Sequence, residues 1–161
     1  MNKCLFLDRD GTINKNYGYI GTYKNFVWLK NSKKAIKYAY NKGYLIIVIS
    51  NQSGVSRGYF TLNDCKKINL KINEELKKNN CKIHDFFYAY YHPKFKNNFS
   101  YLDRKPNPGL FLKAKKKWNI DFNKSFMIGD KITDKIAATK VKIKFKYKRK
   151  NLLSEIKSII D

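Results

Sequence analysis

The chain has 161 residues, a length that suits one compact domain with enough buried apolar surface to fold without a disulfide or a structural metal. Its three cysteines are widely separated, and no apolar run approaches the roughly 20 residues of a membrane span. These features argue against a disulfide framework and an integral membrane protein. The first residues lack the apolar stretch of a signal peptide, so we expect a cytoplasmic protein, and we also expect a monomer.

The formal net charge is +23, because 35 lysines and arginines face only 12 acidic residues. Such a positive field attracts anions and raises the question of a nucleic-acid partner. Only four of the basic residues are arginines, whose forked geometry suits specific phosphate recognition. Abundant lysine together with asparagine and isoleucine is also what AT-rich coding produces without any partner. We therefore do not expect a nucleic-acid partner, but we expect the field to attract a small anionic substrate.

Short apolar runs alternate with helical patterns along the chain, which is typical of strand-helix repeats. The expected strands are residues 3–7, 44–49, 86–91, 125–128 and 141–147. The expected helices are residues 32–41, 61–78, 109–118, 132–140 and 152–160, with Thr61 and Asp64 as a candidate N-cap. We predict an α/β fold with a doubly wound, Rossmann-like parallel sheet, helices on both faces, a single domain over residues 1–161 and no large cap domain.

Polar side chains follow several of the predicted strands directly. Asp8 and Asp10 follow the first strand, Ser50 and Asn51 the second, and Asp130 the fourth. Ligands of open α/β sheets bind at this carboxyl edge. Alternate residues of an extended segment share a side, so Asp8 and Asp10 can face one pocket. Two like charges there are costly unless a cation or a reaction uses them, and a chance pair is a weak explanation in a chain with 12 acidic residues.

Residues 8–12, with the sequence DRDGT, resemble the first motif of the haloacid dehalogenase superfamily of phosphotransferases. By this resemblance Asp8 is the nucleophile that attacks phosphorus. Asp10 is then the acid/base that protonates the leaving oxygen and later activates water. The chemistry is sound on general grounds, since a carboxylate can split one difficult displacement into two easier ones when a metal and hydrogen-bond donors neutralise the phosphoryl charge.

Three further segments resemble the remaining motifs of the superfamily in order: residues 49–54 (ISNQSG), 104–109 (RKPNPG) and 129–134 (GDKITD). Each alone is typical of an ordinary turn or solvated loop, but four in order on strand ends are not. The resemblance implies that Ser50, Arg104 and Lys105 stabilise the phosphoryl group. It also implies a Mg²⁺ site made of Asp8, the backbone carbonyl of Asp10, and Asp130, an all-oxygen set that suits magnesium.

The loops resemble those of the D-glycero-D-manno-heptose-1,7-bisphosphate 7-phosphatases over nearly the whole chain, most clearly at residues 51–61 (NQSGVSRGYFT). We expect Arg57, in that segment, to orient its own loop instead of touching substrate. The rings of Tyr17 and Tyr19 fit either stacking on a sugar or simple loop packing. The substrate contacts implied by the resemblance are Asn16, Tyr17, Gly18, Tyr19, Ser50, Asn51, Gln52, Ser53, Arg104, Lys105 and Lys131.

One departure from that group concerns a structural zinc, which its members commonly bind through a Cys-x-His pair and a Cys-x-Cys pair. The aligned residues here are Ala89 and Tyr91, then Tyr101 and Asp103, so the thiolates are absent. Histidines without thiolates make a poor tetrahedral zinc site. We therefore predict no zinc. We expect the loop over residues 94–102 to be held by aromatic packing of Tyr90, Tyr91, Phe95, Phe99 and Tyr101.

The sequence thus predicts a magnesium-dependent phosphoric monoester hydrolase that forms an aspartyl-phosphate intermediate on a sugar phosphate. The resemblance implies that D-glycero-D-manno-heptose 1,7-bisphosphate loses its 7-phosphate, in precursor synthesis for lipopolysaccharide or capsule. Histidinol-phosphate phosphatase activity is an alternative, but that family usually has an acid at the position of Ser53 and lacks the continuation Arg57-Gly58. A second alternative, suggested by the high positive charge, is a phosphatase that acts on the ends of nucleic acids. A non-catalytic binding module is disfavoured, because it would not need like charges around a metal site.

Overall fold

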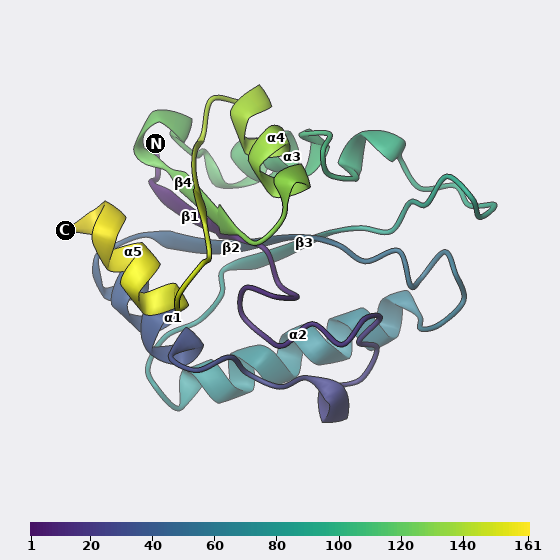
Figure 1. The fold of residues 1–161 in the computed structure, drawn as a ribbon, viewed down its shortest axis with the longest axis horizontal. Coiled ribbons are helices and arrows are strands. Elements are labelled where there is room, and N and C mark those ends of the chain that lie inside the picture. Colours follow the sequence, from purple (N-terminus) through teal and green to yellow (C-terminus); the bar gives the residue numbers. More distant parts are fainter.

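Five strands form one parallel sheet in the computed structural model, which describes all 161 residues. The spatial order is β3-β2-β1-β4-β5, so β1 lies in the middle (Figure 1). The strands are β1 Cys4–Leu7, β2 Leu45–Asn51, β3 Asp85–Ala89, β4 Phe126–Gly129 and β5 Lys144–Tyr147. The chain runs outward from β1 to one side through β2 and β3, and then to the other side through β4 and β5. This reversal creates a crevice at the carboxyl ends of β1, β2 and β4, where ligands of such sheets bind.

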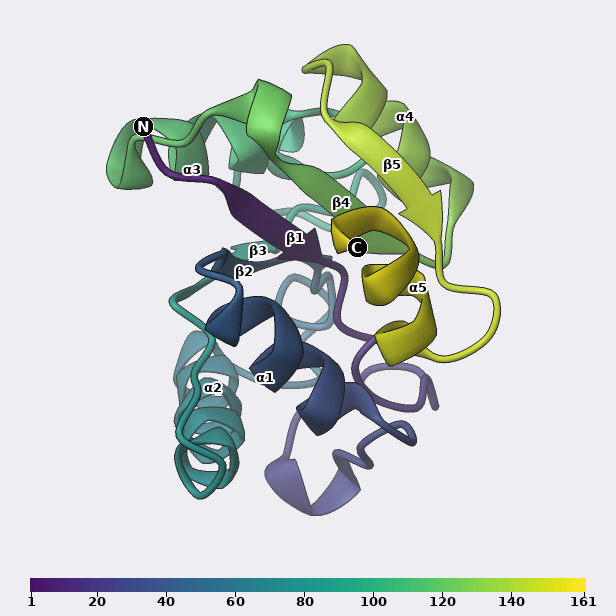
Figure 2. The same ribbon diagram turned by 90° about the vertical axis from the view of Figure 1, so that its left-hand side faces the viewer.

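Helices cover both faces of the sheet (Figures 1 and 2). One face carries α1 Ser32–Asn41, α2 Leu62–Lys77 and α5 Leu152–Ile160. The other carries α3 Gly109–Trp118 and α4 Ile132–Lys140. Short 3₁₀ turns lie at Tyr23–Asn25, Tyr101–Asp103 and Phe122–Lys124. None of the helices combines the length and the apolar character needed to cross a bilayer.

Two hydrophobic cores result from the alternation of side chains along each strand. Leu5 and Leu7 of β1 point into the core shared with α1, α2 and α5. Cys4 and Phe6 point into the core shared with α3 and α4, where the ring of Phe6 meets that of Phe111 at 5.1 Å. Burial on both faces explains why the strands read as continuous apolar runs in the sequence.

The predicted fold is confirmed, and each helix begins and ends within one residue of its expected bounds. The strand ends differ more. β2 continues through Asn51, because its last two residues pair with the end of β3. β3 ends at Ala89, and the next two tyrosine rings pack on loop residues Phe99 and Tyr101. β5 begins at Lys144, three residues later than expected, because Lys142 adopts a left-handed conformation with φ of 59°.

The N-terminus of α2 provides a test of the local sequence signals. The Thr61 hydroxyl oxygen accepts a hydrogen bond from the Asp64 N–H at 3.1 Å, and the Asp64 carboxylate accepts one from the Thr61 N–H at 2.8 Å. Loss of such an N-cap lowers the melting temperature of a domain of this size by about 2–4 °C. We expect this decrease for Thr61→Ala in thermal unfolding monitored by circular dichroism. Asn63→Ala, at an exposed position of the same turn, should cause no decrease, and equal effects of the two changes would contradict the assignment.

Candidate active site

The crevice at the carboxyl ends of the strands contains a small cavity lined only by polar side chains. Its residues come from the segment after β1, the end of β2, the loop before α3 and the start of α4. They are Asp8, Asp10, Ser50, Asn51, Lys105, Lys131, Thr133 and Asp134. The four regions that resemble phosphotransferase motifs are therefore brought together at one edge of the sheet, although Asp8 and Lys105 lie 97 residues apart in sequence. We call this space the inner cavity.

Lys105 is the central cation of the inner cavity and is only 3% exposed. Its Nζ lies 2.9 Å from Oδ1 of Asp8 and 2.6 Å from Oδ1 of Asp134, and it donates to the carbonyl oxygen of Ile49 at 2.7 Å. The contacts with Asp8 and Ile49 are hydrogen bonds, and the contact with Asp134 is an ion pair. Burial opposes the charge of Lys105, but the two carboxylates outweigh burial and raise its pKa.

The backbone of Lys105 is fixed by the end of β2. The Lys105 N–H donates to Oδ1 of Asn51 at 3.0 Å, and Nδ2 of Asn51 donates to the Lys105 carbonyl oxygen at 3.1 Å. This pair of hydrogen bonds joins the third motif to the second. It places the lysine next to Asp8 independently of the long loop that precedes it.

Three carboxylates gather beside the lysine, from Asp8, Asp130 and Asp134, and one oxygen of each lies within 4.8 Å of the others. Burial, followed by the charges of Asp8 and Asp134, raises the pKa of the Asp130 carboxyl to about 7. Oδ1 of Asp130 is buried without a hydrogen-bond partner. An unsatisfied carboxylate oxygen amid like charges fits a bound divalent cation, and oxygen ligands suit magnesium.

Gly11 makes the close approach of Asp130 possible. A Cβ atom at Gly11 would lie 2.2 Å from Oδ2 of Asp130, and its φ of 88° also favours glycine. Asp134 has no role in our sequence interpretation, although it lies within the fourth motif. Its position three residues after Lys131, in the first turn of a predicted helix, could have identified it as a capping residue at the site. There its Oδ2 accepts a hydrogen bond from the Lys131 N–H at 3.0 Å.

Asp10 occupies a different environment, surrounded by hydrogen-bond donors. Its Oδ1 accepts from Nδ2 of Asn14 at 2.9 Å and from Nε of Arg9 at 3.1 Å, and its Oδ2 accepts from Nε2 of Gln52 at 2.9 Å. Gln52 also donates to the Ser50 hydroxyl oxygen at 3.0 Å. The carboxylate is therefore oriented by side chains from two loops, while one edge still faces the cavity.

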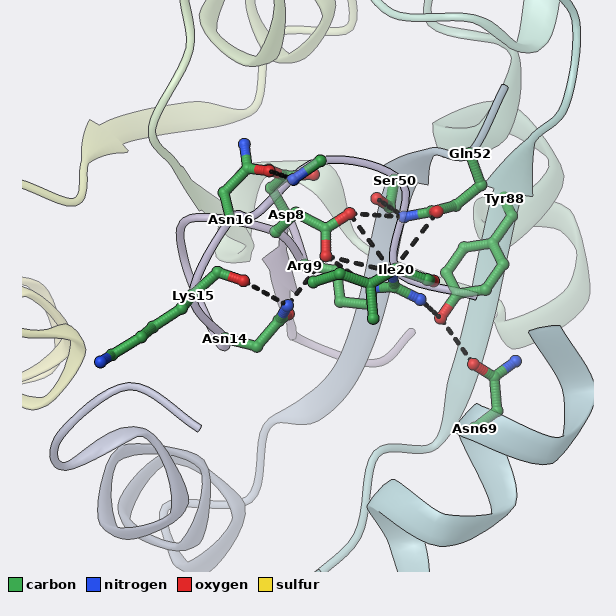
Figure 3. Close-up of polar contacts among 12 residues, drawn as sticks. Asp8, Arg9, Asn14, Lys15, Asn16, Ile20, Ser50, Gln52, Asn69 and Tyr88 are labelled. Carbon is green, nitrogen blue, oxygen red and sulfur yellow. Dashed lines mark hydrogen bonds and ion pairs between the residues drawn. The ribbon is translucent and has the colours of Figure 1, made fainter. Parts of the chain in front are cut away.

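Arg9 is completely buried, although it lies between two active-site aspartates in sequence. Besides Asp10, its guanidinium contacts the Tyr88 hydroxyl and Oε1 of Gln52, each at 3.4 Å. Tyr88 in turn donates to Oδ1 of Asn69 on α2 (Figure 3). Arg9 and Asn14 were missed in the sequence interpretation. The available signal for Arg9 was the alternation of an extended segment, which turns the residue between two site residues toward the interior.

A larger space of about 400 Å³ adjoins the inner cavity, within the usual size of small-molecule sites. We call it the outer cavity. It is lined by Asp10, Asn16, Gly18, Tyr19, Asn51, Gln52, Ser53, Gly54, Arg104, Lys105, Lys131 and Thr133. Ten of the eleven expected substrate contacts thus line one of the two spaces. Tyr17 does not; it is 64% exposed and lines an adjoining surface hollow, which shares Gly18 and Tyr19 with the outer cavity.

The loop between β3 and Lys105 packs through aromatic contacts beside the outer cavity. The ring of Tyr90 lies 5.2 Å from that of Phe99, and the ring of Tyr91 lies 6.4 Å from that of Tyr101. At the positions aligned with zinc ligands, Ala89 is buried and Asp103 forms an ion pair with Lys113. The three cysteines are free and buried, and they lie on β1, on α2 and before β3.

Comparisons with known proteins place this site in a family. A family profile described as polynucleotide kinase 3 phosphatase matches residues 3–154. The D-glycero-beta-D-manno-heptose-1,7-bisphosphate 7-phosphatase of Pasteurella multocida is 37% identical over 146 residues, which cover 89% of this chain and 79% of the relative. The enzyme of the same name from Helicobacter pylori (strain ATCC 700392 / 26695) is 40% identical over 143 residues, which cover 89% and 81%.

A solved structure supports the fold. The D,D-heptose 1,7-bisphosphate phosphatase of B. bronchiseptica, complexed with magnesium and phosphate, superposes with a TM-score of 0.88 at 19% identity and covers 98% of each chain. The family profile and the relatives above 30% identity together settle the membership. This chain belongs to the haloacid dehalogenase-like phosphatases, in the family that includes the D-glycero-beta-D-manno-heptose-1,7-bisphosphate 7-phosphatases.

Proposed function

We propose that the chain hydrolyses a phosphate ester through an aspartyl-phosphate intermediate on Asp8. The observation that carries the proposal is the buried contact between Asp8 and Lys105, which directs a cation at the carboxylate where phosphoryl charge would develop. An oxygen of Asp8 forms a bond to phosphorus as the bond to the leaving oxygen breaks, and Asp10 donates a proton to that oxygen. Asp10 then takes a proton from water as the water attacks phosphorus, which frees phosphate and restores Asp8.

Magnesium fits the carboxylates of Asp8, Asp130 and Asp134, with the backbone carbonyl of Asp10 as the further ligand proposed from sequence. When bound, the ion would neutralise charge on the phosphoryl oxygens. Ser50 and Lys105, which also line the inner cavity, would donate to the same oxygens. Arg104 and Lys131, at the outer cavity, would provide charge-assisted hydrogen bonds to the remainder of an anionic substrate.

The substrate we propose is D-glycero-D-manno-heptose 1,7-bisphosphate, with removal of the 7-phosphate in the cytoplasm for surface-glycan synthesis. The names of the relatives support it, as does an outer cavity large enough for a sugar phosphate. A second candidate is a nucleic-acid end phosphatase. The description of the matching family profile and the net charge of +23 favour it.

A phosphate-release screen tests the function and separates these candidates. The panel contains the heptose bisphosphate, sugar monophosphates, histidinol phosphate and 3′-phosphorylated oligonucleotides, each with and without Mg²⁺. We expect the highest kcat/KM for the heptose bisphosphate and no turnover without the metal. Highest activity on the oligonucleotides, with binding that weakens steeply as salt rises, would favour the second candidate.

Asp8→Asn removes the nucleophile with little change in volume. We expect Mg²⁺-dependent phosphate release to decrease by at least about 10³-fold, because the amide cannot form the acyl phosphate. Thermal unfolding should remain cooperative, since Lys105 keeps Asp134 and the carbonyl of Ile49 as partners. Glu74→Gln, which neutralises an exposed carboxylate on α2, serves as the control. Normal turnover by Asp8→Asn would falsify the mechanism.

Gly11→Ala tests the metal site from the backbone side. Its Cβ would displace the Asp130 carboxylate, so we expect the Mg²⁺ concentration for half-maximal activity to rise by about 10-fold or more. Gly43→Ala is the matched control, because Gly43 has a similar φ of 79° but its Cβ would meet only the Lys3 side chain at 3.7 Å. The control should share the backbone strain and keep the Mg²⁺ dependence. Equal Mg²⁺ dependence of both variants would count against Asp130 as a ligand.

We also propose that the protein binds no structural zinc, because Ala89, Tyr91, Tyr101 and Asp103 provide no thiolate. Metal analysis of protein purified without chelators should find zinc well below one ion per chain. Treatment with EDTA followed by Mg²⁺ should restore full activity, and the melting temperature should be the same before and after. Stoichiometric zinc, or permanent loss of structure after EDTA, would refute this proposal.

A further inference from the structure

Arg57 links its own loop to two other loops around the outer cavity through one side chain. It belongs to the loop after β2. The central carbon of its guanidinium lies 5.1 Å from the ring centroid of Tyr19, in the loop after β1, and 4.8 Å from that of Phe95, in the loop after β3. Its Nη2 lies 2.9 Å from Nε2 of His92. Arg57 does not itself line the outer cavity. We call this set of contacts the Arg57 clamp.

The contact between Arg57 and His92 requires a neutral imidazole. Arginine can only donate, so Nε2 of His92 accepts in this contact. The other ring nitrogen, Nδ1, faces the backbone N–H of Lys94 at 3.1 Å, so donors face both nitrogens and disfavour a doubly protonated ring. Burial, followed by the charges of Arg57, Arg104 and Lys94, lowers the pKa of His92 and keeps the ring neutral. The clamp therefore needs no acidic partner.

One wall of the outer cavity depends on the clamp through Tyr19. This residue has a left-handed backbone with φ of 46°, a conformation that persists in a non-glycine residue only when its surroundings fix it. Its ring packs edge-on against Tyr59 at 4.9 Å and lies under the Arg57 guanidinium. Removal of the guanidinium would leave the strained residue with one fewer contact to hold it.

A second wall depends on the clamp through the loop after β3. Arg104 lines the outer cavity, and its Nη1 donates to the carbonyl oxygen of Tyr91 at 3.1 Å. The next residue is His92, whose ring packs against Phe95 at 5.3 Å. Arg57 contacts both of these last two residues. Arg57 therefore contacts the same segment to which Arg104 is hydrogen-bonded.

We propose that Arg57 is a positioning residue for substrate specificity, which holds Tyr19 and Arg104 in the arrangement that accepts a sugar bisphosphate. For its substrate, this proposal rests on the proposed function. The inner cavity is fixed separately by Lys105 and Asn51. A substrate without a sugar or a second phosphate to bind in the outer cavity should therefore be insensitive to Arg57.

Arg57→Met tests the proposal with two substrates, the heptose bisphosphate and p-nitrophenyl phosphate. We expect KM for the bisphosphate to rise by about 10-fold or more with little change in kcat, because misplaced binding groups weaken substrate positioning. The kcat/KM for p-nitrophenyl phosphate should remain as in the wild type. Arg57→Lys keeps a cation over the rings but lacks the planar fork, so its KM should be intermediate.

Arg149→Met is the matched control, because the guanidinium of Arg149 also lies over an aromatic ring, that of Tyr147 at 5.8 Å, but outside both cavities. We expect this variant to leave kcat and KM unchanged for both substrates. Equal losses on both substrates in Arg57→Met, or an unchanged KM for the bisphosphate, would overturn the proposal.

Limited trypsin digestion tests the clamp without reference to the substrate. Lys94 and Lys96 lie in the loop after β3, and cleavage there reports how firmly the loop is held. We expect faster cleavage at these two sites in Arg57→Met than in the wild type or in Arg149→Met. If the wild type cleaves p-nitrophenyl phosphate but not the bisphosphate, the proposed substrate is wrong, and the digestion still decides on the clamp. An unchanged rate of cleavage at Lys94 and Lys96 in Arg57→Met would overturn the clamp.

Discussion

The ammonium group of Lys105 lies almost fully buried between the carboxylates of Asp8 and Asp134, and the arrangement of the active site depends on this charge triad. A buried cation is stable only when its charge is compensated and its donors are satisfied. Here the compensation comes from Asp8 after β1 and from Asp134 at the start of α4, and a further hydrogen bond goes to Ile49 of β2. The contacts that stabilise the buried charge of Lys105 therefore also bring the ends of β1, β2 and β4 into one site.

The active-site aspartates lie in two contrasting environments. Asp130 is packed among like charges, with one oxygen that has no partner, which favours a cation. Asp10 is surrounded by donors from Arg9, Asn14 and Gln52, which favour a fixed orientation of the carboxylate. Enzymes with paired carboxylates assign different roles to chemically identical groups through such differences in environment. These surroundings fit the proposed division between Asp130 as a metal ligand and Asp10 as the acid/base.

The fold was predictable because its signals are local and repeated. Burial on both faces makes the strands apolar, and the ligand-binding edge of a parallel sheet puts Asp8, Ser50 and Asp130 near one another. The ends of β3 and β5 were not predictable, since they depend on loop packing and on one left-handed residue, Lys142. The strand pattern gives a residue's direction but not its partners.

The parts of the site that the sequence interpretation missed depend on tertiary contacts. Arg9 looks like an exposed charge between two acids, yet Tyr88 and Gln52 line the space that receives it. Asp134 looks like a helix cap and is also a partner of Lys105. Tyr17 follows the family pattern but faces an adjoining hollow. Such outcomes depend on residues far away in sequence, which composition and periodicity do not describe.

Two hydrogen bonds between Asn51 and the backbone of Lys105 attach the lysine to β2 as well as to the loop of residues 94–102 that precedes it. Lys105 is held by the end of β2, so we expect changes in the length or composition of residues 94–102 to leave the lysine next to Asp8. Substrate recognition by this loop could then vary while the contact between Asp8 and Lys105 stays intact. The same attachment marks residues 94–102 as the place to graft new recognition loops onto this small scaffold.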